Sequence, residues 1–177
     1  MFAGRDRRRS SLRFRVWAAP RRSVSRSELR SDQTGRFQIR LRQDSDLEQL
    51  QAVAQQVQSS DGYPIYLPDG DFGCFLTEPA SIAAWVMTDQ DQIVGHVALN
   101  EGTSAPVMLA VNELGYDRPA RYIARLLVDP DARRSGSGRA LLEHARCEAV
   151  AEGCLPMLDV VDIPTAAPAI ALYQADG

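Results

Sequence analysis

Apolar positions along this chain of 177 residues recur with a period of two in some segments and near 3.6 in others. The first alternating segment, FQIRLR at residues 37–42, predicts a half-buried strand. A capping-box sequence at residues 45–48 then begins a predicted amphipathic helix that ends near Ser59. The next segment, DGYPIYLPDGDFG, is rich in Gly, Pro and Asp. It predicts a loop that either shapes a pocket wall or only connects two elements.

The rest of the chain continues this alternation of strand and helix patterns. Two apolar runs at residues 82–88 and 93–99, separated by Asp89-Gln-Asp-Gln92, predict a β-hairpin. The elements expected after it are a short helix at residues 106–114 closed by Gly115, a strand at 122–128, a helix at 138–152, a strand at 155–161 and a last helix with Thr165 as N-cap and Pro168 in its first turn. This order predicts an α/β domain with a mixed sheet.

Residues 1–36 differ from the rest because they show no sustained apolar period. They hold 11 Arg against three acidic residues and are also rich in Ser, so we expect a disordered tail before one domain at residues 37–177. Three explanations stay open for this tail: an interaction arm for anionic partners, an organelle transit peptide, or a start codon upstream of the true one.

Charge and cysteine usage exclude several classes of protein. Residues 37–177 hold 9 Arg and 20 acidic residues, a net charge of −11, which argues against a general nucleic-acid surface. No apolar run approaches the roughly 18 residues of a membrane span, and no signal peptide is visible. Three scattered cysteines without a CxxC pair predict neither a disulfide framework nor a zinc site. We therefore expect a cytoplasmic protein that does not contact a membrane.

The segment Leu126-Leu-Val-Asp-Pro-Asp-Ala-Arg-Arg-Ser-Gly-Ser-Gly-Arg139 indicates a binding site. A buried strand, a short loop and a helix start follow one another here, so backbone N–H groups converge where the helix dipole is positive and predict an anion site. Arg133, Arg134 and Arg139 can contact the same anion. The chain has no Lys for a Walker loop, and Leu141 occupies the third Gly position of a Rossmann fingerprint. A plain loop beside solvated arginines is the alternative.

The order of motifs around this loop is more specific than the loop alone. Arg133-x-x-Gly136-x-Gly138 stands between Val128-x-Pro130 and Ala140-Leu-Leu142, and Leu158-Asp-Val160 and Ala169-Ile-Ala-Leu-Tyr173 follow. Together they resemble the acyl-CoA pyrophosphate loop, the next strand and the Ala-x-x-Leu-Tyr helix of the GNAT-type N-acetyltransferases. The resemblance covers residues 37–177. It implies a GNAT-like fold that transfers an acetyl group from acetyl-CoA to a primary amine, without a metal.

The resemblance also implies roles for individual residues. Backbone groups of the strand would pair with the pantetheine arm, and loop amides would bind the pyrophosphate; the implied acetyl-CoA residues are Leu126, Val128, Arg133, Arg134, Ser135, Gly136, Ser137, Gly138 and Arg139. Tyr173 would be the general acid that protonates the departing thiolate, and a tyrosine that only packs the last helix is the alternative. The acceptor would be a small-molecule or peptide amine, and a homodimer is one implied assembly.

The general base stays open. By register from Arg133, Tyr122 occupies the strand position where the family often has a Glu. The remaining candidates are Glu101, Glu113, Asp117, His96 and a water. His144, in the middle of a predicted helix, is expected at the surface.

The end of the chain departs from the family pattern. Ala166 stands where the family's last helix has an Asn, and the chain ends at Gly177 where the family continues into two more strands. We therefore expect a C-terminally truncated member that lacks its last two strands and leaves residues 155–161 as an unpaired, aggregation-prone edge. A catalytically impaired CoA-binding or interaction module is the alternative function. A third hypothesis assigns the function to the Arg-rich tail as an arm for nucleic acid or an anionic surface.

Overall fold

A computed structural model describes residues 13–16, 36–101, 113, 115, 118–161 and 163–176. Its strands are β1 (Arg13–Val16), β2 (Phe37–Leu41), β3 (Ser81–Asp89), β4 (Gln92–Glu101), β5 (Ala120–Val128) and β6 (Leu155–Val160). Its α-helices are α1 (Leu47–Asp61), α2 (Phe72–Leu76), α4 (Ser137–Ala151) and α5 (Ala167–Asp176). Short 3₁₀ helices lie at Asp44–Asp46, Pro68–Gly70, Pro130–Ala132 and Pro164–Ala166.

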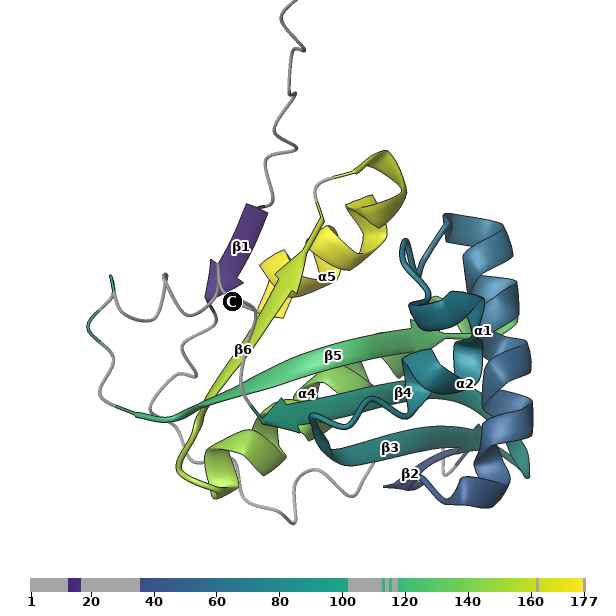
Figure 1. Cartoon of the computed structure of the whole chain (residues 1–177), viewed down its shortest axis with the longest axis horizontal. Coiled ribbons are helices and arrows are strands. Elements are labelled where there is room, and N and C mark those ends of the chain that lie inside the picture. Colours follow the sequence, from purple (N-terminus) through teal and green to yellow (C-terminus); the bar gives the residue numbers. More distant parts are fainter. Residues whose placement is uncertain are drawn as a thin grey trace, which may run out of the picture.

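The strands form one mixed sheet in the order β1-β6-β5-β4-β3-β2 (Figure 1). Neighbouring strands are antiparallel except β5 and β6, which are parallel and are connected through α4. The predicted mixed α/β sheet is therefore confirmed. The predicted hairpin is the β3–β4 pair. The predicted loop at residues 61–73 contains the 3₁₀ helix Pro68–Gly70 and ends in the first residues of α2.

Helices cover both faces of this sheet. Successive residues of β3 point to opposite faces, so Trp85 and Met87 pack into the core under α4, whereas Val86 packs into the core under α1 and α2. Gly95 on β4 permits the close approach of α4, because a Cβ at this position would lie 2.7 Å from Leu141 Cδ1. The two cores place β4 and β5 between helix layers.

Two predicted helix caps are wrong. The capping box before α1 joins Gln43 and Asp46, with the Gln43 N–H donating to the Asp46 carboxylate at 2.7 Å, and not residues 45–48. The reason is Arg40 on β2, which donates two hydrogen bonds to the carboxylate of the buried Asp46 and so fixes its position. The same hydrogen bonds lower the pKa of Asp46. Thr165 lies inside the 3₁₀ helix Pro164–Ala166 that precedes α5, and so is not an N-cap.

The outer edge of β6 is paired, so the prediction of an unpaired edge is wrong. β1 runs antiparallel to β6, from Arg13 opposite Val160 to Val16 opposite Met157 (Figure 1). The pairing satisfies backbone groups that an open edge would expose. The rest of the predicted tail, apart from Arg36, and the predicted helix at residues 106–114, apart from Glu113, lie outside the described residues.

Candidate active site

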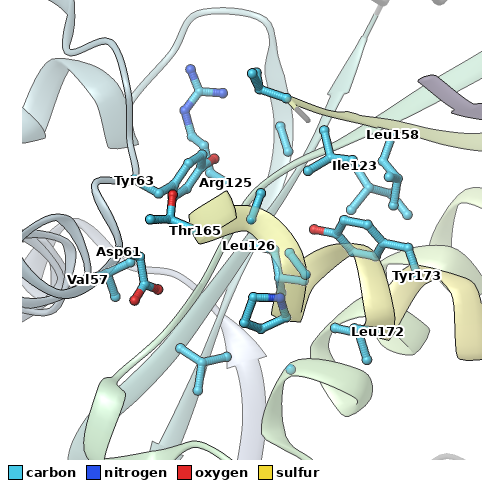
Figure 2. A pocket seen from close by; sticks show the side chains of 18 of the residues that line it. Val57, Asp61, Tyr63, Ile123, Arg125, Leu126, Leu158, Thr165, Leu172 and Tyr173 are labelled. Carbon is cyan, nitrogen blue, oxygen red and sulfur yellow. The ribbon is translucent and has the colours of Figure 1, made fainter. Parts of the chain in front are cut away.

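A cleft opens where β5 and β6 separate. The two strands pair only from Ala120 opposite Leu155 to Tyr122 opposite Met157, and they diverge beyond that point. The resulting cleft has a volume of about 840 Å³ and is lined by β5, β6, α5, the loop before α4 and the segment that follows α1 (Figure 2). The parallel pairing therefore ends at the position where this cleft begins.

A β-bulge interrupts the ladder between β4 and β5 beside the cleft. From the pair His96–Leu127 to the pair Ala98–Ala124, the chain moves along β5 by three residues but along β4 by only two, so β5 holds one extra residue. Arg125, in this stretch, has a φ of 52°. A bulge leaves backbone groups of the extra residue outside the ladder. The His96 Nδ1–H donates to the Arg125 carbonyl at 2.9 Å, which supports the distorted backbone from the opposite strand.

The Arg125 side chain connects this bulge to α2. Its guanidinium contacts the Phe75 carbonyl and the Glu78 carboxylate, and it lies 4.9 Å from the centre of the Phe75 ring. The Asn100 amide donates to the same Glu78 carboxylate at 2.8 Å. These contacts fix one wall of the cleft. An Arg inside the apolar run YIARLLV was the sequence signal for this feature, and our sequence reasoning missed it.

The predicted anion loop forms the other end of the cleft. Gly136, with φ 87°, precedes α4, and the Ala140 N–H donates to the Gly136 carbonyl at 3.0 Å. The N–H groups at the start of α4, those of Ser137 and Gly138, therefore precede the first hydrogen bond of the helix, and the helix dipole makes them attractive to an anion. The Ser135 hydroxyl lies 2.6 Å from both the Ser137 hydroxyl and the Ala132 carbonyl, which tightens the loop.

The three arginines predicted at this loop have different environments. Arg133 donates to both carboxylate oxygens of Asp61 on α1, at 3.0 and 2.6 Å, and so joins the loop to α1. Burial alone would raise the pKa of Asp61, but hydrogen bonds from Arg133 and Ser60 outweigh it and lower the pKa. Arg134 and Arg139 are exposed at the loop. The structure therefore gives Arg133 a tethering contact that the sequence did not indicate.

Tyr173 on α5 points into the middle of the cleft (Figure 2). Burial raises its pKa to about 12, and the negative charge of Asp159 on β6 adds to the shift. The phenol therefore keeps its proton at neutral pH. Tyr122, at the last paired position of β5, donates a hydrogen bond to the Asp159 carboxylate. The single charge in the apolar strand LPMLDV was the sequence signal for Asp159, which the sequence analysis placed in a strand motif but not among the site residues.

Most of the base candidates from the sequence lie away from this cleft. His96 is fully buried between β3 and β5, and burial lowers its pKa to about 4. Glu101 and Glu113 are exposed and do not line the cleft, and Asp117 lies outside the described residues. His144 is half-buried against Trp85, with ring centres 5.0 Å apart, so the expectation of a surface histidine is wrong.

The described part of the chain has neither a metal-binding cluster nor a membrane-spanning helix. No group of three or more His, Cys, Asp or Glu side chains there is arranged to hold a metal ion. None of the helices in those ranges has the length and apolar character needed to cross a membrane.

The sequence model of the acetyltransferase (GNAT) family matches residues 45–177. Among solved structures, the ribosomal-protein-S18-alanine N-acetyltransferase from Escherichia coli is 21% identical, with a TM-score of 0.56, over 80% of this chain and 76% of that chain. A GNAT-family acetyltransferase from Staphylococcus aureus Mu50 is 16% identical, with a TM-score of 0.60, over 80% of this chain and 83% of that chain. The aminoglycoside N-acetyltransferase AAC(6')-Iy, in complex with CoA, is 16% identical, with a TM-score of 0.56, over 80% and 86% of the two chains. No curated protein matches the chain.

The structural likenesses establish the fold, and the family match spans the anion loop, β6 and α5. The predicted GNAT-like fold is thereby confirmed. The chain belongs to the GNAT family of acetyltransferases, a class of enzymes that use acyl-CoA.

Proposed function

We propose that this protein transfers an acetyl group from acetyl-CoA to a primary amine on a small molecule or peptide. The observation that carries the proposal is one cleft with the N-terminus of α4 at one end and the protonated phenol of Tyr173 in its middle. An acyl-CoA has a polyanionic end and a reactive thioester. The N-terminus of α4 suits the polyanionic end, and the Tyr173 phenol suits the thioester.

The donor would lie along β5 from the loop to the bulge. Backbone groups of Leu126 and Val128, past the point where β6 departs, would pair with the pantetheine arm as a further strand does. The pyrophosphate would take the amides and side chains of the loop: Arg133, Arg134, Ser135, Gly136, Ser137, Gly138 and Arg139. This orientation would bring the thioester toward Tyr173.

Tyr173 would act as general acid. The amine nitrogen attacks the thioester carbonyl, the C–S bond breaks, and the thiolate takes the proton from the phenol. A phenol with a pKa of about 12 does not lose this proton to solvent before the thiolate forms.

A cationic acceptor suits the charge of the protein. Residues 37–177 carry a net charge of −11, and Glu78 and Asp159 both line the cleft. The similar proteins named above include enzymes for an alanine of ribosomal protein S18 and for aminoglycosides, which supports testing both kinds of amine. The free cysteines Cys74, Cys147 and Cys154 support action in the reducing cytoplasm.

The experiment is an acetyl-transfer assay with purified full-length protein. Sisomicin, spermidine and a peptide with an N-terminal alanine are each incubated with acetyl-CoA, while thiol release and the acetylated amine are measured together. We expect thiol release and product in equal amounts with at least one amine. If acetyl-CoA binds in calorimetry and no amine is acetylated, the protein is instead the CoA-binding module.

A further inference from the structure

The segment that follows α1 brings an apolar wall to the cleft. Tyr63 and Ile65 both line the cleft, and the Tyr63 ring meets the Phe75 ring of α2 edge-on, with ring centres 6.0 Å apart. Figure 2 shows Tyr63 on the α1 side of the cleft and Tyr173 on α5. Ile65 is 58% exposed, although it lies in a cleft. An open apolar surface inside a cleft is typical of a place where a ligand buries an apolar group.

Two side-chain contacts hold this segment in position. The Gln58 amide on α1 donates to the Pro64 carbonyl at 3.0 Å, between the two lining residues Tyr63 and Ile65. Asp61, at the end of α1, accepts both hydrogen bonds from the Arg133 guanidinium. The apolar wall is therefore anchored both to α1 and to the anion loop.

A carboxylate continues the wall beyond Phe75. The Arg125 guanidinium lies 4.9 Å from the centre of the Phe75 ring and contacts Glu78, which also lines the cleft. The Asn100 amide donates to Glu78 at 2.8 Å, and both contacts use the Oε2 atom of the carboxylate. The Glu78 side chain is 39% exposed, so its other oxygen, Oε1, can accept a hydrogen bond from a ligand in the cleft.

The carboxylates on this side of the cleft are matched by guanidinium groups. Arg133 pairs with Asp61, and Arg125 pairs with Glu78, so neither pair carries a net charge. The other arginines of the anion loop line the same cleft. A ligand with several ammonium groups would bring its further positive charges close to these guanidinium groups, which costs free energy. The wall therefore suits a ligand with one ammonium group and an apolar remainder.

We infer that the acceptor of this protein is a primary amine with a single positive charge and an apolar group about as large as a phenyl ring. The ammonium group donates a hydrogen bond to Oε1 of Glu78, and the apolar group lies against Tyr63, Ile65 and Phe75. At neutral pH a primary alkylamine, with a pKa of about 10, is almost entirely the ammonium ion, so this is the form that binds. This inference rests on the proposed acetyl transfer and narrows the class of acceptor.

The test compares phenylpropylamine with propylamine, which share an aminopropyl chain and one positive charge and differ by the ring. Each is incubated with full-length protein and saturating acetyl-CoA, and thiol release gives kcat/KM. We expect kcat/KM to be about 30-fold higher for phenylpropylamine, because the ring is buried against the apolar wall. Spermidine, which has three charges and no ring, should not exceed propylamine.

Two variants of the segment after α1 test the apolar contact. Ile65→Ser should lower kcat/KM for phenylpropylamine about tenfold and leave propylamine within twofold, because only the ring contacts this side chain. Tyr66→Ser is the matched control, since Tyr66 is an exposed apolar residue of the same segment that does not line the cleft. It should behave as the wild type with both amines.

Glu78→Gln tests the polar contact. The amide has nearly the same size and removes the charge, so KM for both amines should rise about tenfold, while their ratio and the dissociation constant of acetyl-CoA stay within twofold. Phenylpropanol, which has the ring without the ammonium group, should inhibit the variant and the wild type equally. A collapsed wall would weaken this inhibitor too. Asp44→Asn, an exposed acid outside the cleft, is the matched control.

A peptide that begins with phenylalanine offers the same chemistry as the small amine. Phe-Ala-Ala-amide and Ala-Ala-Ala-amide have equal charge and differ by the ring, and we expect the first to be the better acceptor of the two. Whichever of phenylpropylamine and Phe-Ala-Ala-amide gives the higher kcat/KM identifies the source of the acceptor as a small molecule or a peptide.

Two results would overturn the inference while acetyl transfer itself stands. One is equal kcat/KM for propylamine and phenylpropylamine. The other is a preference for spermidine or sisomicin over phenylpropylamine and the phenylalanine peptide. If acetyl-CoA binds and none of these amines is acetylated, the proposed function fails, and the assignment of the acceptor fails with it.

Discussion

At the scale of single residues, His96 shows how the core supports the distorted strand beside the cleft. Its Nδ1–H donates to the Arg125 carbonyl, and a carbonyl can only accept, so the proton of the neutral ring is on Nδ1. Burial lowers the pKa of His96 from its ordinary 6.5 to about 4, with the positive charges of Arg42 and Arg125 acting in the same direction. The folded protein therefore favours the neutral ring.

This shift predicts a loss of stability in mild acid. The stabilising contribution of neutral His96 is complete above pH 6.5 and decreases as the pH falls toward 4, because the unfolded chain takes up the proton first. Between pH 8 and pH 5 we expect about 2 kcal/mol of the free energy of unfolding to be lost through this residue. Urea denaturation at both pH values measures it. His96→Asn should remove this part of the pH dependence, whereas His144→Gln should retain it.

Tyr173 carries the second prediction at this scale. Replacing it with Phe removes the proton donor and keeps the ring that packs between α5 and the core. We expect kcat to fall by about 100-fold, while the dissociation constant of acetyl-CoA stays within twofold. Steady-state kinetics and calorimetry measure the two quantities. Lost acetyl-CoA binding with unchanged kcat would instead make Tyr173 a packing residue.

At the scale of elements, the loop before α4 is joined to α1 by the Arg133–Asp61 pair. We expect Arg133→Met to lower the free energy of unfolding by about 1 kcal/mol, since the paired side chains are only partly exposed. Arg134→Gln, in an exposed position on the same loop, should leave unfolding unchanged and weaken acetyl-CoA binding several-fold, with a smaller salt dependence. Chemical denaturation measures the stability of the two variants, and calorimetry measures their binding of acetyl-CoA. Unchanged stability in Arg133→Met together with lowered stability in Arg134→Gln would contradict these roles.

Elements with a strong local pattern were predictable from the sequence. The helices α1 and α4, the β3–β4 hairpin and the anion loop follow from apolar periodicity, turn residues and glycines close together in the chain. The bulge at Arg125 and the contacts between Arg133 and Asp61, 72 residues apart, or between Tyr122 and Asp159, 37 apart, depend on how the elements meet. No local pattern encodes such contacts, so these parts of the candidate site appear only in the folded protein.

At the scale of the whole molecule, β1 completes the sheet from a segment that precedes the rest of the domain. Its pairing covers β6, the strand that carries Asp159. The expectation of an open edge was wrong because the strand that pairs with β6 can come from any part of the chain. The four residues of β1 are enough to cover most of the six residues of β6.

Removal of β1 should therefore expose the edge of β6. We expect deletion of residues 1–19 to lower the thermal midpoint and to produce oligomers in size-exclusion chromatography, because the uncovered edge can pair with other molecules. Deletion of residues 1–11 retains β1 and serves as the matched control. Equal midpoints and elution volumes for the two deletions would mean that β1 does not protect the sheet.

The central claim is that the cleft between β5 and β6 binds acetyl-CoA, and a thermal melt of the full-length protein with and without this ligand tests it most directly. Acetyl-CoA at about 100 times its dissociation constant should add about 2.7 kcal/mol to the free energy of unfolding, which corresponds to roughly 5–10 °C. At the same concentration, a variant with both Arg134→Gln and Arg139→Gln should show a smaller shift. A wild-type melt that acetyl-CoA leaves unchanged would contradict the assignment of the cleft.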